Sequence, residues 1–330
     1  MRVRLLALAM AALYWSCTPA SAAESSNTEY HAAAETSTEL EIVPVRGNVY
    51  MLADAAGNVT VQVGDEGVLL VDTLDGSLSE KLLRTVKTLS SKPIRWIINT
   101  SADPNYVGGN ATVASSGKAI ASAMLKYLGA PTAAAIIADE NVYKTMSSAK
   151  PALPFGAWPT STYSTSKNLY VNGEAVRVLH VPAAHTDGDS IVLFRRSDVI
   201  SVGGIIDFDH YPVFGDHRGG TLAGTIDALN KLIELSVPAH LEEGGTMIIP
   251  GHGRLCDQSE LVEYRDMLTI IRDDVQELIR EGKSLQQIVA ARPTLGYDPR
   301  YGLPSGAWTN DRFVEAVYHE LKQQRLRKSG

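Results

Sequence analysis

The first half of the chain alternates short apolar runs with polar turns. Four runs rich in β-branched residues follow one another, and the turns Arg46-Gly47-Asn48 and 64–67 separate two pairs of them. Short runs of this kind between glycine-containing turns are typical of β-hairpins. The pattern therefore predicts an antiparallel meander with strands at 40–45, 49–52, 59–63 and 68–71.

A helix follows the meander. Ser77 and Glu80 have the spacing of a capping box, and leucine and valine then recur on one helical face as far as Leu89. We therefore expect a helix over 77–89. The remaining elements expected in this half are a strand at 94–98, helices at 123–128 and 133–146, and a loop at 151–164.

The second half repeats the order of meander, helix and strand. Its strands are expected at 169–171, 176–181, 190–195 and 199–202, with an amphipathic helix at 221–235 and a last strand at 246–249. Two halves of this kind predict an α+β fold, in which two sheets pack together and carry helices on their outer faces.

The pattern becomes helical after Asp257. Apolar residues recur every three or four positions up to Gly282, Ser284 and Gln287 form a second capping box, and Thr309 begins a final helix. We expect a C-terminal helical extension at 257–330, which packs on the sheets or on a second subunit as a homo-oligomer.

The N-terminus has the features of a signal peptide. Arg2 and Arg4 precede an apolar stretch that is too short for a membrane span, and Ala20-Ser21-Ala22 is a small-residue cleavage site. We expect residues 1–22 to be removed near Ala22-Ala23, residues 23–38 to form a flexible lead-in, and the mature chain to be periplasmic or secreted without a membrane span.

The charge of the chain argues against one class of partner, and its cysteine content argues against two kinds of cross-link. The chain has a net charge of −7 and no basic stripe, which argues against nucleic acid. Of its two cysteines only Cys256 would remain after cleavage, so neither an internal disulfide nor a thiolate metal cluster is expected. A small-molecule ligand or substrate stays open.

The stretch 99–110 reads Asn-Thr-Ser-Ala-Asp-Pro-Asn-Tyr-Val-Gly-Gly-Asn and follows the predicted strand 94–98. It resembles the metallo-β-lactamase superfamily, whose members carry Asn-Thr-His-x-His-x-Asp-His-x-Gly-Gly-Asn here. The segments around His185 and His252 match two further landmarks of that superfamily. The resemblance implies a four-layer αββα sandwich at 39–256, followed by the helical extension.

The same resemblance implies loops that hold two zinc ions, with about three protein ligands for each ion. His185 and His252 keep the family's histidines, and Asp103 places a carboxylate where the family has histidine. Four positions have lost their ligand: Ser101, Asn105, Tyr106 and Gly204. Three residues after Gly204 are candidate substitutes: Asp207, Asp209 and His210.

Three functional hypotheses follow. The first is an exported protein of hydrolase ancestry that binds a small molecule or partner, with little or no dinuclear-zinc hydrolysis. The second is a hydrolase of an ester, thioester, lactone or β-lactam that uses one zinc ion at most, held by Asp103, His185 and His252. In it Tyr106 or Asn105 would donate to the developing oxyanion. The third is a structural or assembly role of the helical extension.

Overall fold

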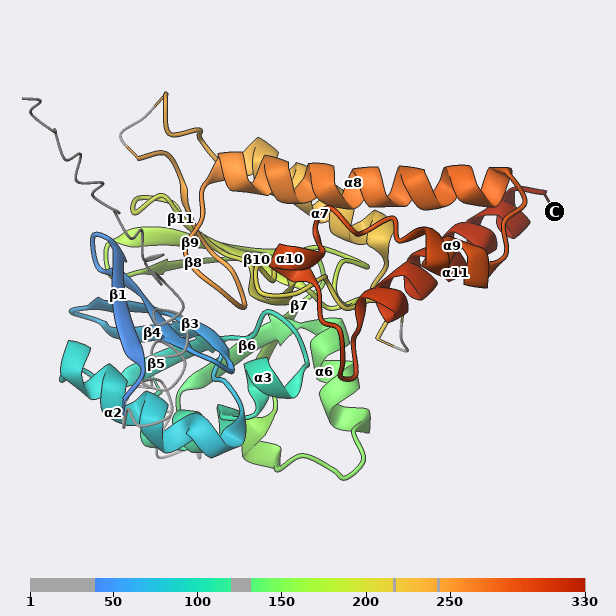
Figure 1. Ribbon diagram of the computed structural model, residues 1–330. Helices are drawn as coiled ribbons and strands as arrows, with labels where there is room; N and C mark the ends of the chain where they lie inside the picture. Colours follow the sequence, from blue (N-terminus) through green and yellow to red (C-terminus); the bar gives the residue numbers. More distant parts are fainter. Residues whose placement is uncertain (1–38, 120–131, 216–217, 242–243, 330) are drawn as a thin grey trace, which may run out of the picture. The chain divides into compact units, whose positions relative to one another are not determined.

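Two β-sheets packed face to face form the centre of the protein, and helices cover the outer face of each sheet (Figure 1). The computed structural model describes residues 39–119, 132–215, 218–241 and 244–329. The predicted signal peptide (1–22), the lead-in (23–38) and the helix expected at 123–128 lie outside the described residues.

The first sheet has seven strands in the order β1-β2-β3-β4-β5-β6-β7. The first four form the predicted antiparallel meander, and the last four run parallel to one another. The strands are β1 (Glu41–Arg46), β2 (Val49–Asp54), β3 (Gly57–Gly64), β4 (Gly67–Val71), β5 (Ile94–Ile98), β6 (Ala135–Asp139) and β7 (Ser161–Tyr163).

The second sheet has five strands in the order β12-β11-β10-β9-β8. The strands β8, β9, β10 and β11 pair antiparallel, and β12 pairs parallel with β11. All five were predicted, and their bounds are β8 (Ser166–Val171), β9 (Glu174–His180), β10 (Ser190–Phe194), β11 (Val199–Ser201) and β12 (Met247–Ile249).

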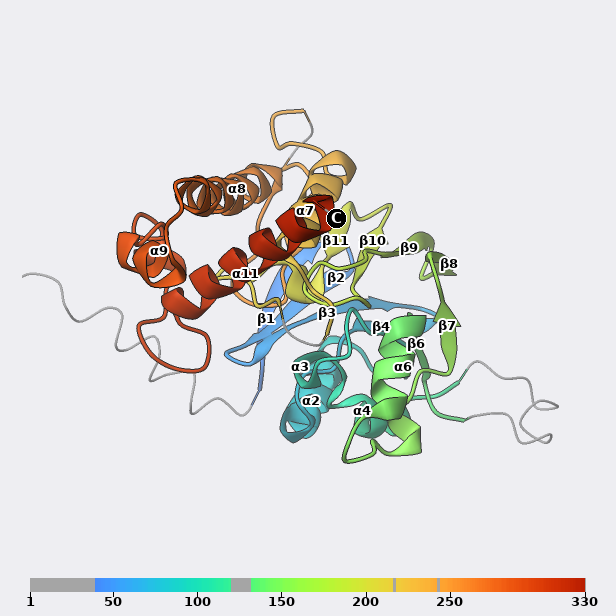
Figure 2. The same ribbon diagram turned by 90° about the vertical axis from the view of Figure 1, so that its right-hand side faces the viewer.

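Three apolar layers hold the four-layer αββα sandwich together. Residues from both sheets, including Ile98 and Phe194, fill the space between the sheets. On the outer face of the first sheet, α2 (Ser79–Leu89) and α4 (Asn110–Ser116) bury apolar side chains. On the outer face of the second sheet, α7 (Leu222–Leu235) and α8 (Gln258–Arg280) do the same (Figure 2). The predicted fold class is confirmed.

The helix expected at 133–146 is wrong in its first half. Residues 135–139 form strand β6, and α6 (Glu140–Ser148) begins only after Asp139, whose Oδ1 accepts a 2.8 Å hydrogen bond from the backbone of Asn141. Ile136 and Ile137 are buried in the first sheet. Burial in a parallel sheet outweighs the helix propensity of the alanines, which is only a weak preference.

The capping box expected at Ser77 is also wrong. Asp75 accepts a hydrogen bond of 2.9 Å from the backbone of Ser77 and so caps a short 3-10 helix, η1 (Gly76–Leu78), after which α2 begins at Ser79. Four further short helices were not predicted: α3 (Pro104–Val107), η2 (Phe155–Ala157), η3 (Gly203–Ile205) and α10 (Asp298–Tyr301). The loop expected at 151–164 is wrong at its end, where residues 161–163 form strand β7 and pair with β6.

The extension consists of α8, α9 (Leu285–Ala291), α10 (Asp298–Tyr301) and α11 (Asn310–Ser329). The capping box at Ser284 and Gln287 is confirmed. Tyr211 anchors the extension, because its ring stacks on Phe313 at 4.5 Å and its backbone oxygen accepts a hydrogen bond of 3.2 Å from Trp308. In the part of the chain that is described, no helix combines the length and apolar composition of a membrane span.

Candidate functional site

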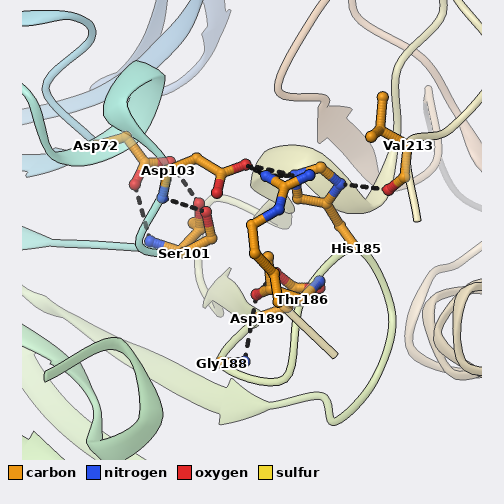
Figure 3. Close-up of polar contacts among 10 residues, drawn as sticks. Asp72, Ser101, Asp103, His185, Thr186, Gly188, Asp189 and Val213 are labelled. Carbon is orange, nitrogen blue, oxygen red and sulfur yellow. Dashed lines mark hydrogen bonds and ion pairs between the residues drawn. The ribbon is translucent and has the colours of Figure 1, made fainter. Parts of the chain in front are cut away.

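The loop 99–110 is braced by buried polar side chains. Asp72, at the end of β4, accepts hydrogen bonds from the backbone nitrogen and the hydroxyl of Thr100, at 2.8 and 2.7 Å (Figure 3). Asn110 donates to the side chain of Asn99 at 2.8 Å. Burial raises the pKa of Asp72 to about 7, although the two bonds from Thr100 lower it. The loop thus keeps a defined backbone even though its side chains have changed.

Two of the four positions that lost a ligand have local roles. Ser101 is buried, and its Oγ accepts a hydrogen bond of 3.2 Å from the backbone nitrogen of Asp103. Asn105 is exposed on the first turn of α3. Ser101 therefore stabilises the turn that presents Asp103, and Asn105 lies at the surface.

The other two positions, Tyr106 and Gly204, are neighbours. Tyr106 exposes only 4% of its surface. A Cβ atom added to Gly204 would lie 3.1 Å from the Tyr106 hydroxyl and 2.7 Å from Cδ2 of His185. Real Cβ atoms almost never come that close, so a side chain at position 204 requires its neighbours to move. Burial, followed by the charge of Asp72, raises the pKa of Tyr106 well above its usual value, so the phenol is neutral.

Asp103, His185 and Arg218 form a hydrogen-bonded group, which we call the Asp103–His185–Arg218 cluster. His185 Nε2 lies 2.6 Å from Asp103 Oδ2, and Arg218 Nη1 donates to the same oxygen (Figure 3). Arg218 Nη1 also lies 3.5 Å from His185 Nε2. The side chains of Arg218 and Asp103 are 22% and 14% exposed, so solvent screens their attraction only in part.

The hydrogen-bond partners of His185 favour its protonated form. Its Nδ1 lies 2.9 Å from the carbonyl oxygen of Val213, which can only accept, and its Nε2 faces the Asp103 carboxylate. Burial lowers the pKa of His185, but the hydrogen bond to Asp103 and the charges of Asp189 and Asp103 outweigh it and raise the pKa. Burial likewise raises the pKa of Asp103, but bonds and charges from His185 and Arg218 hold it at about 2. These contacts favour an imidazolium at His185, beside the Arg218 guanidinium and around the Asp103 carboxylate.

The second retained histidine, His252, packs elsewhere. Its Cε1 would lie 3.4 Å from a Cβ on Gly57, and its ring meets the Tyr106 ring edge-on at 6.4 Å. Asp103 and His185 are thus brought together, whereas His252 contacts Tyr106. Across the described ranges, no three His, Cys, Asp or Glu side chains are grouped so that they could share one metal ion.

The candidate substitutes form a local turn of their own. Asp207 Oδ1 accepts hydrogen bonds from the backbone nitrogens of Asp209 and His210, at 2.8 and 3.0 Å, and its Oδ2 lies 3.3 Å from His210 Nδ1. Asp209 is exposed. The backbone of this turn pairs with the backbone of His252, but its side chains stabilise the turn itself.

Little open space remains beside the cluster. The hollow that Asp103 and Arg218 share with Asn141, Thr186 and Asp187 has a volume of about 10 Å³. A cavity needs about 10–15 Å³ to hold one water molecule. This hollow therefore has room for about one water molecule and not for a larger ligand.

Comparison with solved structures identifies the fold. A double mutant of the sec-alkylsulfatase Pisa1 superimposes with a TM-score of 0.60 at 14% identity, over 85% of this chain and 50% of that one. The alkylsulfatase Pisa1 from Pseudomonas sp. gives a TM-score of 0.57 at 15% identity, with the same coverage. The metallo-β-lactamase from Pontibacter korlensis gives 0.53 at 17% identity, over 70% of this chain and 99% of that one.

The chain has the metallo-β-lactamase fold. It spans about half the length of the alkylsulfatases that it matches. No family model matches the sequence, and no curated protein sequence matches it either.

The zinc pair of the metallo-β-lactamase superfamily does not fit the side chains in this chain. Metal ligands must be deprotonated, whereas the contacts of His185 with the Val213 carbonyl and the Asp103 carboxylate favour its protonated form. Asp103 is already paired with two cations. The resemblance places the bridging aspartate at Gly204, where a Cβ atom would lie 2.7 Å from His185 Cδ2. We therefore derive no chemical step through a metal ion.

Arg218 was missed by sequence reasoning. It occupies none of the family's ligand positions. Its loop can lie against the loop of His185 only because two glycines follow Arg218. A Cβ on Gly220 would lie 2.0 Å from the backbone oxygen of His185, and the backbone oxygen of Arg218 accepts a hydrogen bond of 2.9 Å from Asp187. The signal that could have found it is the Arg-Gly-Gly step, which allows one loop of the metallo-β-lactamase fold to lie directly against another.

Proposed function

We propose that this protein is a non-hydrolytic, metal-free binding protein built on the metallo-β-lactamase fold. The observation that supports the proposal is the Asp103–His185–Arg218 cluster. In it a guanidinium donates to the carboxylate oxygen that would otherwise be available to a metal ion. The cation that stabilises these loops is then part of the chain, and the former metal site has a structural role.

Electrostatics support this assignment. A divalent ion would have to displace Arg218 from Asp103 and take the proton from His185 Nε2. It would gain two protein ligands, whereas zinc sites normally have three or four. The displaced guanidinium would also remain nearby, and like charges at short range repel each other. We expect zinc to bind weakly at best.

Thermal unfolding in the presence of metal and chelator tests the proposal. Purified protein is melted alone, with excess EDTA and with excess zinc. A ligand that binds only the native state raises the melting temperature, so a metal-free protein gives the same value in all three samples. Ester, thioester, lactone and β-lactam probes are expected to be hydrolysed no faster than by the unfolded chain. A melting temperature that falls in EDTA and recovers in zinc contradicts the proposal.

One observation favours the alternative of a mononuclear hydrolase. Asp103 and His185 come from loops far apart in the sequence and still meet at 2.6 Å, as two ligands of one ion would. This function needs Arg218 to swing away and His252 to approach. It predicts zinc-dependent hydrolysis of one of the four probes, with loss of activity in His252→Ala.

The proposal extends to location. The basic start and the small-residue cleavage site of residues 1–22 lead us to propose export, with the binding function outside the cytoplasm. Cell fractionation and N-terminal sequencing test this point. A mature chain that begins near Ala23 is expected, and a cytoplasmic chain that retains residues 1–22 contradicts it.

A further inference from the structure

A cavity of about 310 Å³ lies in the helical extension, away from the Asp103–His185–Arg218 cluster. Its wall is built by the end of α9, by α10, by the loop before α11 and by the first turns of α11. Figures 1 and 2 both show α9 beside α11. Small-molecule sites in proteins typically have volumes from about 300 Å³ upward, so this cavity has the size of a ligand site.

The wall combines an apolar side with polar groups. Val289, Leu303 and Val314 contribute the apolar side. Thr294 also lines the cavity and exposes only 2% of its surface. Its hydroxyl makes no hydrogen bond within the described residues and is not among the side-chain atoms sealed from solvent. The accessible part of Thr294 therefore faces the cavity with an unused hydroxyl.

The charges of the wall favour a cation. Arg292 Nη2 lies 3.3 Å from Asp298 Oδ2, and the Tyr211 hydroxyl donates to Asp298 Oδ1 at 3.1 Å, so these two charges compensate each other. Asp311 makes no hydrogen bond or ion pair with any residue in the described part of the chain. One carboxylate, in the first turn of α11, thus has no cationic side chain as its partner. The Asp311 carboxylate would repel an anionic ligand, and the one arginine of the wall, Arg292, is already paired with Asp298.

Arg292, the arginine of this ion pair, lies at the end of α9. Arg292 ends α9 in the left-handed conformation, with φ 51° and ψ 60°, a position where glycine is the usual residue. Its side chain pairs with Asp298, which leaves Asp311 as the only carboxylate without a cationic side-chain partner among the residues of the cavity wall that the structure describes.

We propose that this cavity binds a small organic cation with an alkyl body, that is, an alkylammonium compound. Its alkyl part would pack on Val289, Leu303 and Val314. Its ammonium group would donate hydrogen bonds to the Asp311 carboxylate and to the Thr294 hydroxyl. Binding here does not depend on whether zinc binds at the Asp103–His185–Arg218 cluster, because no residue of the cavity wall belongs to the loops of that cluster.

Isothermal titration of the full chain with three probes of equal size tests this site. The probes are n-hexylammonium chloride, 1-hexanol and sodium hexanoate. We expect hexylammonium to bind about fivefold more tightly than 1-hexanol, and more tightly still than hexanoate, because only this probe brings a positive charge to a carboxylate that lacks a cationic partner. Equal affinities for all three probes, or no binding of hexylammonium, overturn the proposal.

Variants locate the binding. Asp311→Asn removes the charge at an exposed position and is expected to weaken hexylammonium about fivefold, the upper range for an exposed charge pair. Val289→Trp fills the cavity and is expected to abolish binding. Asp274→Asn makes the same change at an exposed position of α8 outside the cavity and serves as the matched control. Binding that is unaffected by Asp311→Asn, or weakened equally by Asp274→Asn, contradicts the assignment, even if Val289→Trp fails to fold.

Discussion

Replacing Arg218 by alanine should destabilise the protein and at the same time let zinc bind weakly between Asp103 and His185, because the guanidinium that repels the ion is gone. The guanidinium donates to Asp103 Oδ2, and its removal leaves a largely buried carboxylate with His185 as its remaining partner among the contacts of the cluster. Removal of one partner from a buried ion pair typically costs about 3–5 kcal/mol. Because His185 remains and the pair is 14–22% exposed, we expect a loss of about 2 kcal/mol.

This loss of stability can be measured as a decrease in the melting temperature. For a domain of this size, about 2 kcal/mol corresponds to a decrease of about 5 °C. In the variant, Asp103 and His185 can share a zinc ion with water molecules. Zinc at about 100 times its dissociation constant would then return about 2.7 kcal/mol of stability, which the wild-type chain should not gain.

Two further variants control this experiment. Arg218→Lys keeps a positive charge beside Asp103 and is expected to remain insensitive to zinc. Arg312→Ala removes an arginine whose side chain is 66% exposed and lies 3.6 Å from Glu315, its one ion-pair partner among the described residues. Its melting temperature should stay within about 1 °C of the wild type. An unchanged melting temperature in Arg218→Ala, or zinc stabilisation of the wild type equal to that of the variant, would refute the reasoning.

Three other predictions concern the site and the extension. Asp72 has a higher pKa in the folded chain than in the unfolded one, so the folded wild type should lose on the order of 4 kcal/mol of stability as the pH rises from about 4 to 7. Urea unfolding at several pH values should show this loss in the wild type and not in Asp72→Asn. Gly204→Asp, which restores the family's aspartate, should lower stability by about 1–3 kcal/mol through its clash with His185, without zinc binding. Phe313→Ala removes the ring stacked on Tyr211 and should cost about 3–5 kcal/mol and speed proteolysis of α11, whereas Leu326→Ala, at an exposed residue, should change neither.

The fold was predictable where local pattern and burial agree. The β-branched runs of both meanders became strands, because such residues suit the buried sheet surfaces that they form. The alanine-rich stretch 135–139 was misassigned, since its burial between β5 and β7 depends on parts of the chain far away in sequence. Ser284 formed its predicted capping box, whereas at Ser77 the neighbouring Asp75 supplied the cap.

The candidate site was predictable only in part. The loop frame of Asn99 and Asn110 and the histidines at 185 and 252 could be found by motif, because glycines and asparagines fix those loops. The partner of Asp103 could not be found in this way. Arg218 lies 115 residues further along the chain, and its side chain reaches the site only because its loop packs closely on the backbone of His185. Contacts of that kind arise from packing between loops and leave no local spacing in the sequence.

Anomalous diffraction at the zinc edge, from crystals of the wild-type chain soaked in zinc, tests the central claim most directly. The central claim is that Arg218 provides the positive charge beside Asp103 and His185. We predict no anomalous peak between these two residues, and continuous electron density for the Arg218 guanidinium on Asp103. A strong zinc peak within bonding distance of Asp103 and His185, with Arg218 turned away, would contradict the account.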